Sequence, residues 1–131
     1  MFAGLTRTAI VRLAPSHERE SLLMPPATRE QANNFNELQR LSGSSEGAVR
    51  YLETTAQIDV REFLPKIKAP TLVMHLRDDR GVSIELGRDV AAKIPGARFV
   101  ALPGSNHIML EQDPGIALLF YELRDFLNEK A

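Results

Sequence analysis

Thr-Leu-Val-Met-His-Leu-Arg-Asp-Asp-Arg-Gly-Val-Ser, residues 71–83, joins an apolar run, a charged turn and a helix cap in immediate succession. Residues 71–75 follow a proline and are mostly apolar, which predicts a β-strand. Ser83 predicts the N-cap of a helix that runs to about Ile94, just before a Pro-Gly stop. Residues 98–102 predict a second strand. This strand–helix–strand order predicts two parallel strands joined by a right-handed crossover.

The C-terminal residues predict a tight loop at residues 103–107 and a last helix that ends near Asn128. Asp113 is expected to cap this helix, and Pro114 is expected at its first position, which proline favours. The helix carries a broad apolar face, made of Ile116, Leu119, Phe120, Leu123, Phe126 and Leu127.

Two strands are too few for a parallel sheet, because such sheets have both faces covered and are almost never two strands wide. We expect strand 71–75 to have a further neighbour, and residues 69–131 to be the end of a larger doubly wound sheet. An unpaired apolar strand edge invites pairing with another chain. We therefore expect the isolated polypeptide to self-associate, or to bind a complementing chain, through this edge.

Residues 1–68 are predicted to form a helical segment of separate character. Thr28 is expected to cap a helix over residues 29–41. Four apolar side chains in this helix recur every three positions and predict one narrow buried stripe, made of Ala32, Phe35, Leu38 and Leu41.

A Ser-Gly-Ser-Ser break separates this helix from the next one. Ser44 or Ser45 is expected to cap the second helix, which runs from residue 46 to about residue 58. Asp59 is expected to cap a short turn through Phe63, and this turn ends at Pro65.

The overall composition excludes several classes of protein. The 131 residues have the length of one ordinary domain, and 16 Lys and Arg against 17 Asp and Glu argue against a nucleic-acid or membrane-surface binder. The chain has no cysteine, which excludes disulfides, thiolate metal sites and a cysteine nucleophile. No apolar run is long enough for a bilayer and no signal-peptide core is found, so a cytoplasmic location is expected.

Polar side chains follow both predicted strands at their carboxyl ends, where ligands and catalytic groups gather in a doubly wound sheet. Asp78 and Asp79 follow the first strand, and His107 lies in the loop after the second. A carboxylate can accept a hydrogen bond from one ring nitrogen of the histidine and leave the other free as a general base. The alternative is that the aspartates are solvated turn residues and His107 is an ordinary loop histidine.

The stretch Ala69–Val82 resembles the strand and acid turn of α/β-hydrolases. Residues 94–107 resemble their histidine-bearing end, and the order of acid and then histidine also matches this family. The resemblance covers residues 60–131. Phe35–Arg40 and Ile58–Arg61 are similar to the lid region of hydrolase-like domains attached to bacterial helix-turn-helix regulators and nucleotide cyclases.

The resemblance implies the C-terminal part of an α/β-hydrolase fold, with two parallel strands and their helices preceded by a helical lid-like segment. It implies that Asp79 is the acid and His107 the histidine of a catalytic triad. Two residues depart from the family pattern at the acid turn: Leu76 stands where glycine is usual, and Ser83 stands where proline is common.

A serine nucleophile is not found in the setting that this family requires. Gly43-Ser44-Ser45-Glu46-Gly47 has the letters Gly-x-Ser-x-Gly, but a nucleophile elbow must follow a buried strand, and residues 36–41 are predicted to be helical. Ser45 is therefore interpreted as a helix cap and Ser105 as a loop serine.

The other histidines show no pattern of a metal site. His75 ends a strand and is interpreted as a packing residue, while His17 lies among charged residues and is expected at the surface. No two histidines stand four apart with a glutamate between them, and no Gly-rich loop follows a strand. We expect no metal and no organic cofactor.

The expected function is that of an incomplete α/β-hydrolase-like protein. It carries the acid and histidine of a Ser-Asp-His triad for ester or acyl hydrolysis, and it would act on a small ester-like molecule only if an N-terminal segment completed it. The alternative is a non-catalytic binding or regulatory module derived from the hydrolase fold.

Overall fold

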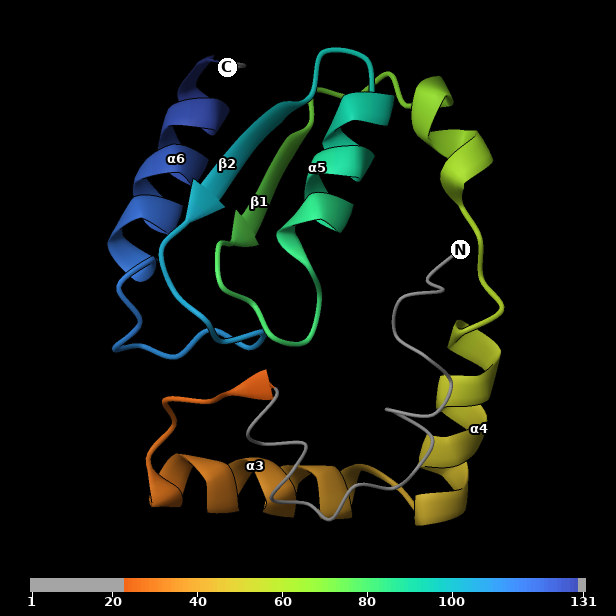
Figure 1. Ribbon diagram of the computed structural model, residues 1–131, viewed down its shortest axis with the longest axis vertical. Helices are drawn as coiled ribbons and strands as arrows, with labels where there is room; N and C mark the ends of the chain where they lie inside the picture. Colours follow the sequence, from red (N-terminus) through yellow and green to blue (C-terminus); the bar gives the residue numbers. More distant parts are fainter. Residues whose placement is uncertain (1–22, 130–131) are drawn as a thin grey trace. The chain divides into compact units, whose positions relative to one another are not determined.

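The computed structural model describes residues 23–129 of the chain (Figure 1). The chain divides into two compact units, of which the first ends at Asp59 and the second begins at Val60. The division predicted between residues 68 and 69 stays a prediction, and His17 lies outside the described residues. None of the helices within residues 23–129 combines the length and apolar character that a membrane crossing requires.

The first unit contains the helices α3 (Arg29–Ser42) and α4 (Ser45–Thr55). Thr28 caps α3 as predicted: its hydroxyl accepts a hydrogen bond from the Gln31 amide at 3.2 Å, and the Gln31 side chain accepts one from the Thr28 amide at 2.9 Å. The cap of α4 is Ser44, whose hydroxyl accepts from the Gly47 amide at 3.1 Å. The alternative cap, Ser45, is instead the first residue of the helix.

The predicted buried stripe of α3 is wrong, because α3 has no buried residue and Leu38 and Leu41 are 60% and 69% exposed. The reason lies in the helical period. Each residue turns a helix by about 100°, so a step of three residues falls about 60° short of a full turn. Side chains spaced by three therefore wind around the helix, and only Ala32 and Phe35, at one end of the set, are half-buried.

The segment that leads into the sheet also differs from the prediction. Helix α4 ends at Thr55 rather than near Ile58. The following turn is a 3₁₀ helix, η1 (Arg61–Lys66), which contains Pro65 instead of ending at it. Its N-cap residue is Val60, one position after the expected Asp59. Leu64 of η1 is buried, and η1, which belongs to the second unit, packs against the first α-helix of that unit.

The second unit is built on two parallel strands, β1 (Leu72–Leu76) and β2 (Arg98–Leu102), joined through helix α5 (Ile84–Lys93) and followed by helix α6 (Ile116–Glu129). The strands pair in the register Leu72 to Arg98 through Leu76 to Leu102. The predicted strand–helix–strand–helix order is confirmed. Ser83 caps α5 as expected, because its hydroxyl accepts from the Glu85 amide at 3.3 Å.

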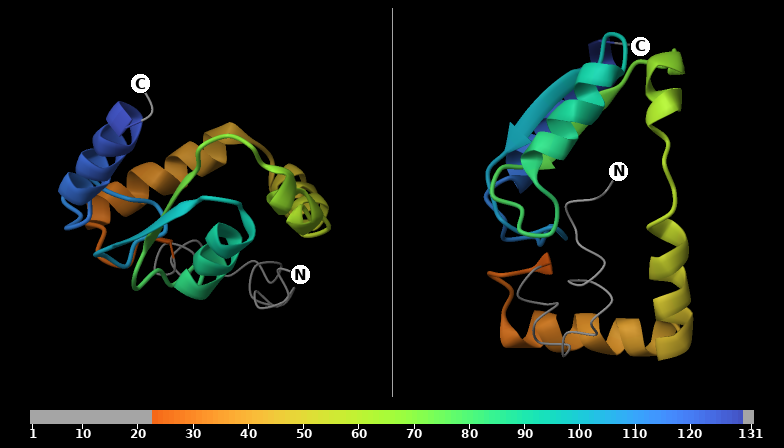
Figure 2. Two further views of the ribbon diagram at one scale, coloured as in Figure 1. Left: turned by 90° about the horizontal axis from the view of Figure 1, so that it is seen from above. Right: turned by 45° about the vertical axis from the view of Figure 1, so that its right-hand side comes forward.

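Helices α5 and α6 cover opposite faces of this small sheet (Figures 1 and 2). Phe99 lies on the α5 side, where the guanidinium of Arg88 stands 5.4 Å from the centre of its ring. Arg98, the preceding residue, lies on the α6 side and binds Asp125 at 3.1 Å. Because side chains alternate along a strand, Leu76 and Leu102 also face α6, where both are buried.

Arg98 ties the start of β2 to α6. Its guanidinium donates to the Asp125 carboxylate at 3.1 Å and to the Glu122 carbonyl oxygen at 3.2 Å, and the Glu129 carboxylate lies 3.5 Å away. The hydrogen bond to Asp125, helped by the charges of Glu129 and Glu122, raises the pKa of Arg98 above its ordinary value. This network lies at the end of β2 that is remote from residues 103–107.

The start of α6 differs from the prediction, because α6 begins at Ile116 and neither Asp113 as a cap nor Pro114 as a first residue is right. The Asp113 carboxylate instead binds two groups inside the preceding loop, Asn106 and the Leu110 amide. The broad apolar face is only partly covered by the sheet. Several of its members stay exposed, namely Phe120, Leu123 and Leu127.

Candidate active site

Asp79 lies in the turn between β1 and α5, and its carboxylate points back into the turn. Its Oδ1 accepts a hydrogen bond from the Gly81 amide at 2.7 Å and from the Val82 amide at 3.0 Å. The side chain is 5% exposed. An aspartate that binds its own turn in this way is held in one orientation. The neighbouring Asp78 is exposed. The two adjacent aspartates therefore differ in burial, and the carboxylate of Asp79 is the one held inside the turn.

The acid turn and the histidine loop begin side by side, because backbone pairing continues beyond the two strands. The Arg77 amide donates to the Leu102 carbonyl oxygen at 2.8 Å, and the Asp78 amide donates to the Gly104 carbonyl oxygen at 3.0 Å. These bonds fix the two loops against each other at the carboxyl end of the sheet. His107, three residues after Gly104, therefore emerges next to the acid turn.

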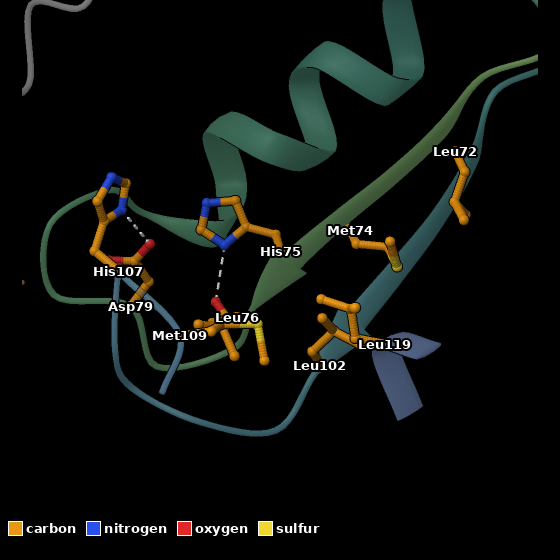
Figure 3. A pocket seen from close by; sticks show the side chains of 9 residues that line it. All are labelled: Leu72, Met74, His75, Leu76, Asp79, Leu102, His107, Met109 and Leu119. Carbon is orange, nitrogen blue, oxygen red and sulfur yellow. Dashed lines mark hydrogen bonds and ion pairs between the residues drawn. The ribbon is translucent and has the colours of Figure 1, made fainter. Parts of the chain in front are cut away.

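The structure brings Asp79 and His107 together, although 28 positions separate them in the sequence (Figure 3). Nδ1 of His107 lies 2.9 Å from Oδ2 of Asp79. Because an ionised carboxylate only accepts hydrogen bonds, this contact favours the tautomer with the hydrogen on Nδ1 and leaves Nε2 as a base. The His107 side chain is 40% exposed, and a Cβ atom at residue 81 would lie 3.2 Å from its Cγ. Gly81 thus lets the ring lie against the turn that holds the acid.

A hollow of about 440 Å³ adjoins the pair. Most of its lining is apolar and comes from the strands, the histidine loop and α6, namely Leu72, Met74, Leu76, Leu102, Met109 and Leu119, with His75, Asp79 and His107 as the polar members. Figure 3 shows the polar members gathered near the carboxyl end of β1, while Leu72 lies toward the other end. Met109 was not expected here; its position two residues after His107 was the available signal.

His75 is a packing residue, as interpreted from the sequence. Nδ1 of its ring lies 2.8 Å from the carbonyl oxygen of Leu76. The ring also lies against Gly87 of α5, at a distance where a Cβ atom would be 2.7 Å from its Cδ2. The ring is therefore held between its own strand and the helix. Among residues 23–129, no group of three potential metal-binding side chains is found.

Neither candidate serine lies in the local setting of a triad nucleophile. Ser45 is an exposed residue in the first turn of α4, and what precedes it is the end of α3, not a strand. Ser105 is half-buried in the loop before His107. Among the described residues of the second unit, no serine hydroxyl is hydrogen-bonded to His107. The surroundings of Ser45 thus lack the strand-to-helix elbow that a nucleophilic serine needs.

A sheet with helices on both faces defines an α/β protein, and a carboxylate–imidazole pair lies at the carboxyl ends of its two neighbouring strands. Comparison with known proteins agrees: residues 3–114 match the α/β hydrolase fold family. The chain belongs to this family.

One relative is the non-heme chloroperoxidase CPO-A1 of Kitasatospora aureofaciens. The two sequences are 38% identical over 86 residues, which make up 64% of this chain and 31% of that protein. The chain therefore spans less than a third of the length of the relative it matches.

Proposed function

We propose that Asp79 and His107 are the acid and the base of a Ser-His-Asp triad, and that the serine and the oxyanion hole come from a polypeptide segment that is not among these 131 residues. The observation that carries this proposal is the 2.9 Å contact between His107 Nδ1 and Asp79 Oδ2. Two backbone amides hold the carboxylate from its other oxygen, so it can orient the ring without turning away.

In the proposed mechanism, Nε2 of His107 removes the proton of the serine hydroxyl as its oxygen attacks the acyl carbon of a small ester. The same nitrogen then gives the proton to the leaving alcohol, and the acyl-enzyme is hydrolysed by a water that His107 activates in turn. Asp79 stabilises the imidazolium that forms in each step. Donors in the oxyanion hole would stabilise the negative charge on the carbonyl oxygen.

The second part of the proposal is that the sheet is completed by a further strand beside β1. The Thr71 carbonyl oxygen accepts from Arg98, and the Arg77 amide donates to Leu102, so the backbone groups of these residues point at β2. Polar groups alternate between the two edges of a strand, so those of residues 72, 74 and 76 point away from β2. Within residues 23–129 no strand pairs with that edge.

The hollow supports this second part. Its lining includes Leu72 and Met74, from one face of β1, and His75, from the other. Because residues from both faces of β1 line it, the hollow reaches the free edge of this strand, and it extends from there to Leu102 of β2 and Leu119 of α6. We infer that the added strand pairs with the free edge of β1. We also infer that the substrate binds next to Nε2 of His107, at the carboxyl end of the completed sheet. Without a complementing segment, a second copy of the chain would pair with the same edge.

A second candidate reaction is the peroxide-dependent oxidation of halide. It is favoured by a single observation, that the relative sharing 38% identity is named a chloroperoxidase without haem. Both reactions are open to a test on one protein.

The first experiment treats the purified 131-residue protein with a fluorophosphonate and measures its intact mass. We expect no adduct, because the proposal places the nucleophile outside these 131 residues. A stoichiometric adduct that is lost in His107→Ala would overturn this part of the proposal and make a serine of this chain the nucleophile.

The second experiment joins the part of the Kitasatospora relative that lies outside the matched region to this chain. The fusion is assayed for p-nitrophenyl acetate hydrolysis and for halogenation with peroxide, with Asp79→Asn and His107→Ala as controls. We expect hydrolysis that both substitutions abolish. A folded fusion that is inactive in both assays would favour a non-catalytic binding or regulatory module.

A further inference from the structure

Asn106 and Asp113 are the two polar residues that are buried as whole residues, backbone included, in the described part of the chain. Asn106 immediately precedes His107, and both buried residues lie in the irregular loop between β2 and α6. Burial of a polar side chain is costly unless it is hydrogen-bonded. A buried amide and a buried carboxylate in an irregular loop therefore need a specific reason to be there.

The two side chains bind each other with both ends of the carboxylate. Nδ2 of Asn106 donates to Oδ1 of Asp113 at 2.7 Å and to Oδ2 at 2.9 Å. Oδ2 also accepts from the Leu110 amide at 2.7 Å. Since a carboxylate offers only acceptors, the amide nitrogen must face it, and the orientation of the Asn106 side chain is fixed.

These bonds close the loop across seven positions, and His107 is the first residue inside the closed part. The loop is pinched again further out: a Cβ atom at residue 115 would lie 2.5 Å from the carbonyl oxygen of Pro103, so the two ends of the loop are in backbone contact. The backbone of His107 is therefore tied to α6 through Asp113 as well as to β2.

The imidazole ring of His107 is held by fewer contacts than the backbone of the loop. It is 40% exposed, and the hydrogen bond to Asp79 and the contact with Gly81 are what the acid turn supplies. Where the ring stands relative to Asp79 thus depends on where the loop holds the Cα atom of residue 107. A shift of the order of 1 Å is enough to break a hydrogen bond of this length.

We propose that Asn106 and Asp113 are positioning residues, whose buried pair holds His107 within hydrogen-bond distance of Asp79. Its meaning for catalysis rests on the proposed function. Its effect on the histidine does not, because the tautomer of His107 can be measured in the 131-residue chain without any activity.

The test records the long-range ¹H–¹⁵N spectrum of the histidine rings in the full chain at about pH 8.5, where an ordinary imidazole is neutral and ordinary carboxylates are ionised. Wild-type His107 is expected as the Nδ1–H tautomer. Asn106→Asp places two carboxylates against each other, and we expect the Nδ1–H tautomer of His107 to be lost. The exchanged pair, Asn106→Asp with Asp113→Asn, restores a carboxylate and an amide and leaves an amide oxygen for Leu110, so we expect the tautomer to return.

Arg98→Met is the matched control, because it removes a polar network at the opposite end of β2 and should lower stability without changing the His107 tautomer. The proposal is overturned if folded Asn106→Asp keeps the wild-type tautomer, or if the folded exchanged pair does not recover it. If Asn106→Asp does not fold, the exchanged pair decides alone. Unfolding of both would also overturn the proposal, because the pair would then be a general requirement for folding. An inactive fusion protein with the tautomer changes as expected would reject the proposed function and keep this inference.

Discussion

The imidazole of His75, on β1, lies so close to Gly87 of α5 that a Cβ atom at residue 87 would stand 2.7 Å from its Cδ2. The contact between Nδ1 and the Leu76 carbonyl oxygen, at 2.8 Å, keeps the ring in this place. The helix can approach the strand here because glycine has no side chain. This contact is therefore a determinant of how α5 packs on the sheet.

We expect Gly87→Ala to destabilise the protein by about 1 kcal/mol in urea unfolding. Alanine stabilises a helix by about 0.5–1 kcal/mol relative to glycine, but overpacking a filled site costs about 1–3 kcal/mol, so the clash with the ring decides the sign. The double variant His75→Ala with Gly87→Ala removes the clash and should be more stable than Gly87→Ala alone. A gain in stability from Gly87→Ala alone would contradict this account.

A second glycine sets the geometry of the histidine loop. Gly104 has φ +133°, and a Cβ atom there would lie 3.0 Å from Cδ2 of Leu76, the residue that stands where the family usually has glycine. We expect Gly104→Ala to lower the free energy of unfolding by about 1–3 kcal/mol, because residues that carry a side chain rarely adopt this backbone conformation. The matched control is Gly43→Ala: Gly43 has φ 173° and no atom within 4 Å of its Cβ position. Its effect should stay within about 0.5 kcal/mol in the same urea titration.

The parts of the fold that the sequence predicts correctly depend on short-range interactions. Thr28 and Ser83 cap their helices through bonds to amides two or three residues away, so the sequence alone contains both partners. The two strands are predicted because a short apolar run after a proline, or before a turn, has few other ways to be buried.

The wrong predictions concern features that depend on residues far away in the sequence, or on three-dimensional geometry that the order of residues does not show directly. Asp113 has the sequence context of a helix cap, and its burial against Asn106 depends on how the whole loop closes. The three-residue spacing in α3 looks like a stripe in the sequence and winds around the helix in space. Asn106 itself carried no signal at the sequence level.

The sequence predicts that an aspartate after β1 and His107 lie close together. That a carboxylate after β1 would meet His107 follows from the parallel strands, whose carboxyl ends share one edge. The choice of Asp79 over Asp78 came from the family resemblance, and the turn supplies its physical reason, because the Gly81 and Val82 amides draw the Asp79 carboxylate inward. The catalytic roles of both residues stay predictions.

The proposed pairing of another strand with β1 predicts opposite effects for two neighbouring prolines. The backbone amide of Met74 points to the free edge, so Met74→Pro should leave the two-stranded sheet folded and remove a donor that an added strand needs. The amide of Val73 points to β2, so Val73→Pro should unfold the sheet. We expect light scattering to detect dimers or larger assemblies of the wild-type chain, and a monomer with wild-type circular dichroism for Met74→Pro.

A compact wild-type monomer, stable across the concentrations measured, would argue against the free edge as a site of pairing. So would a Met74→Pro variant that folds and assembles as the wild type does. Val73→Pro serves as the internal control, because it changes the adjacent residue and shows that proline in this strand is harmful when the amide faces β2.

The last prediction concerns Asp79→Asn. The oxygen of the new amide can still accept from the Gly81 and Val82 amides, so we expect the turn to fold and the free energy of unfolding to change by less than about 1 kcal/mol. The amide nitrogen then faces Nδ1 of His107, where a donor meets a donor, and the ring should change to the Nε2–H tautomer, which cannot accept the serine proton. In the active fusion protein, we expect hydrolysis to fall about 10⁴-fold, the loss typical of this replacement in a Ser-His-Asp triad.

Asp78→Asn is the matched control, since Asp78 is exposed, and it should keep both the tautomer of His107 and the rate of hydrolysis. Equal losses in the two variants would show that the charge of the turn, and not the contact with His107, is what matters.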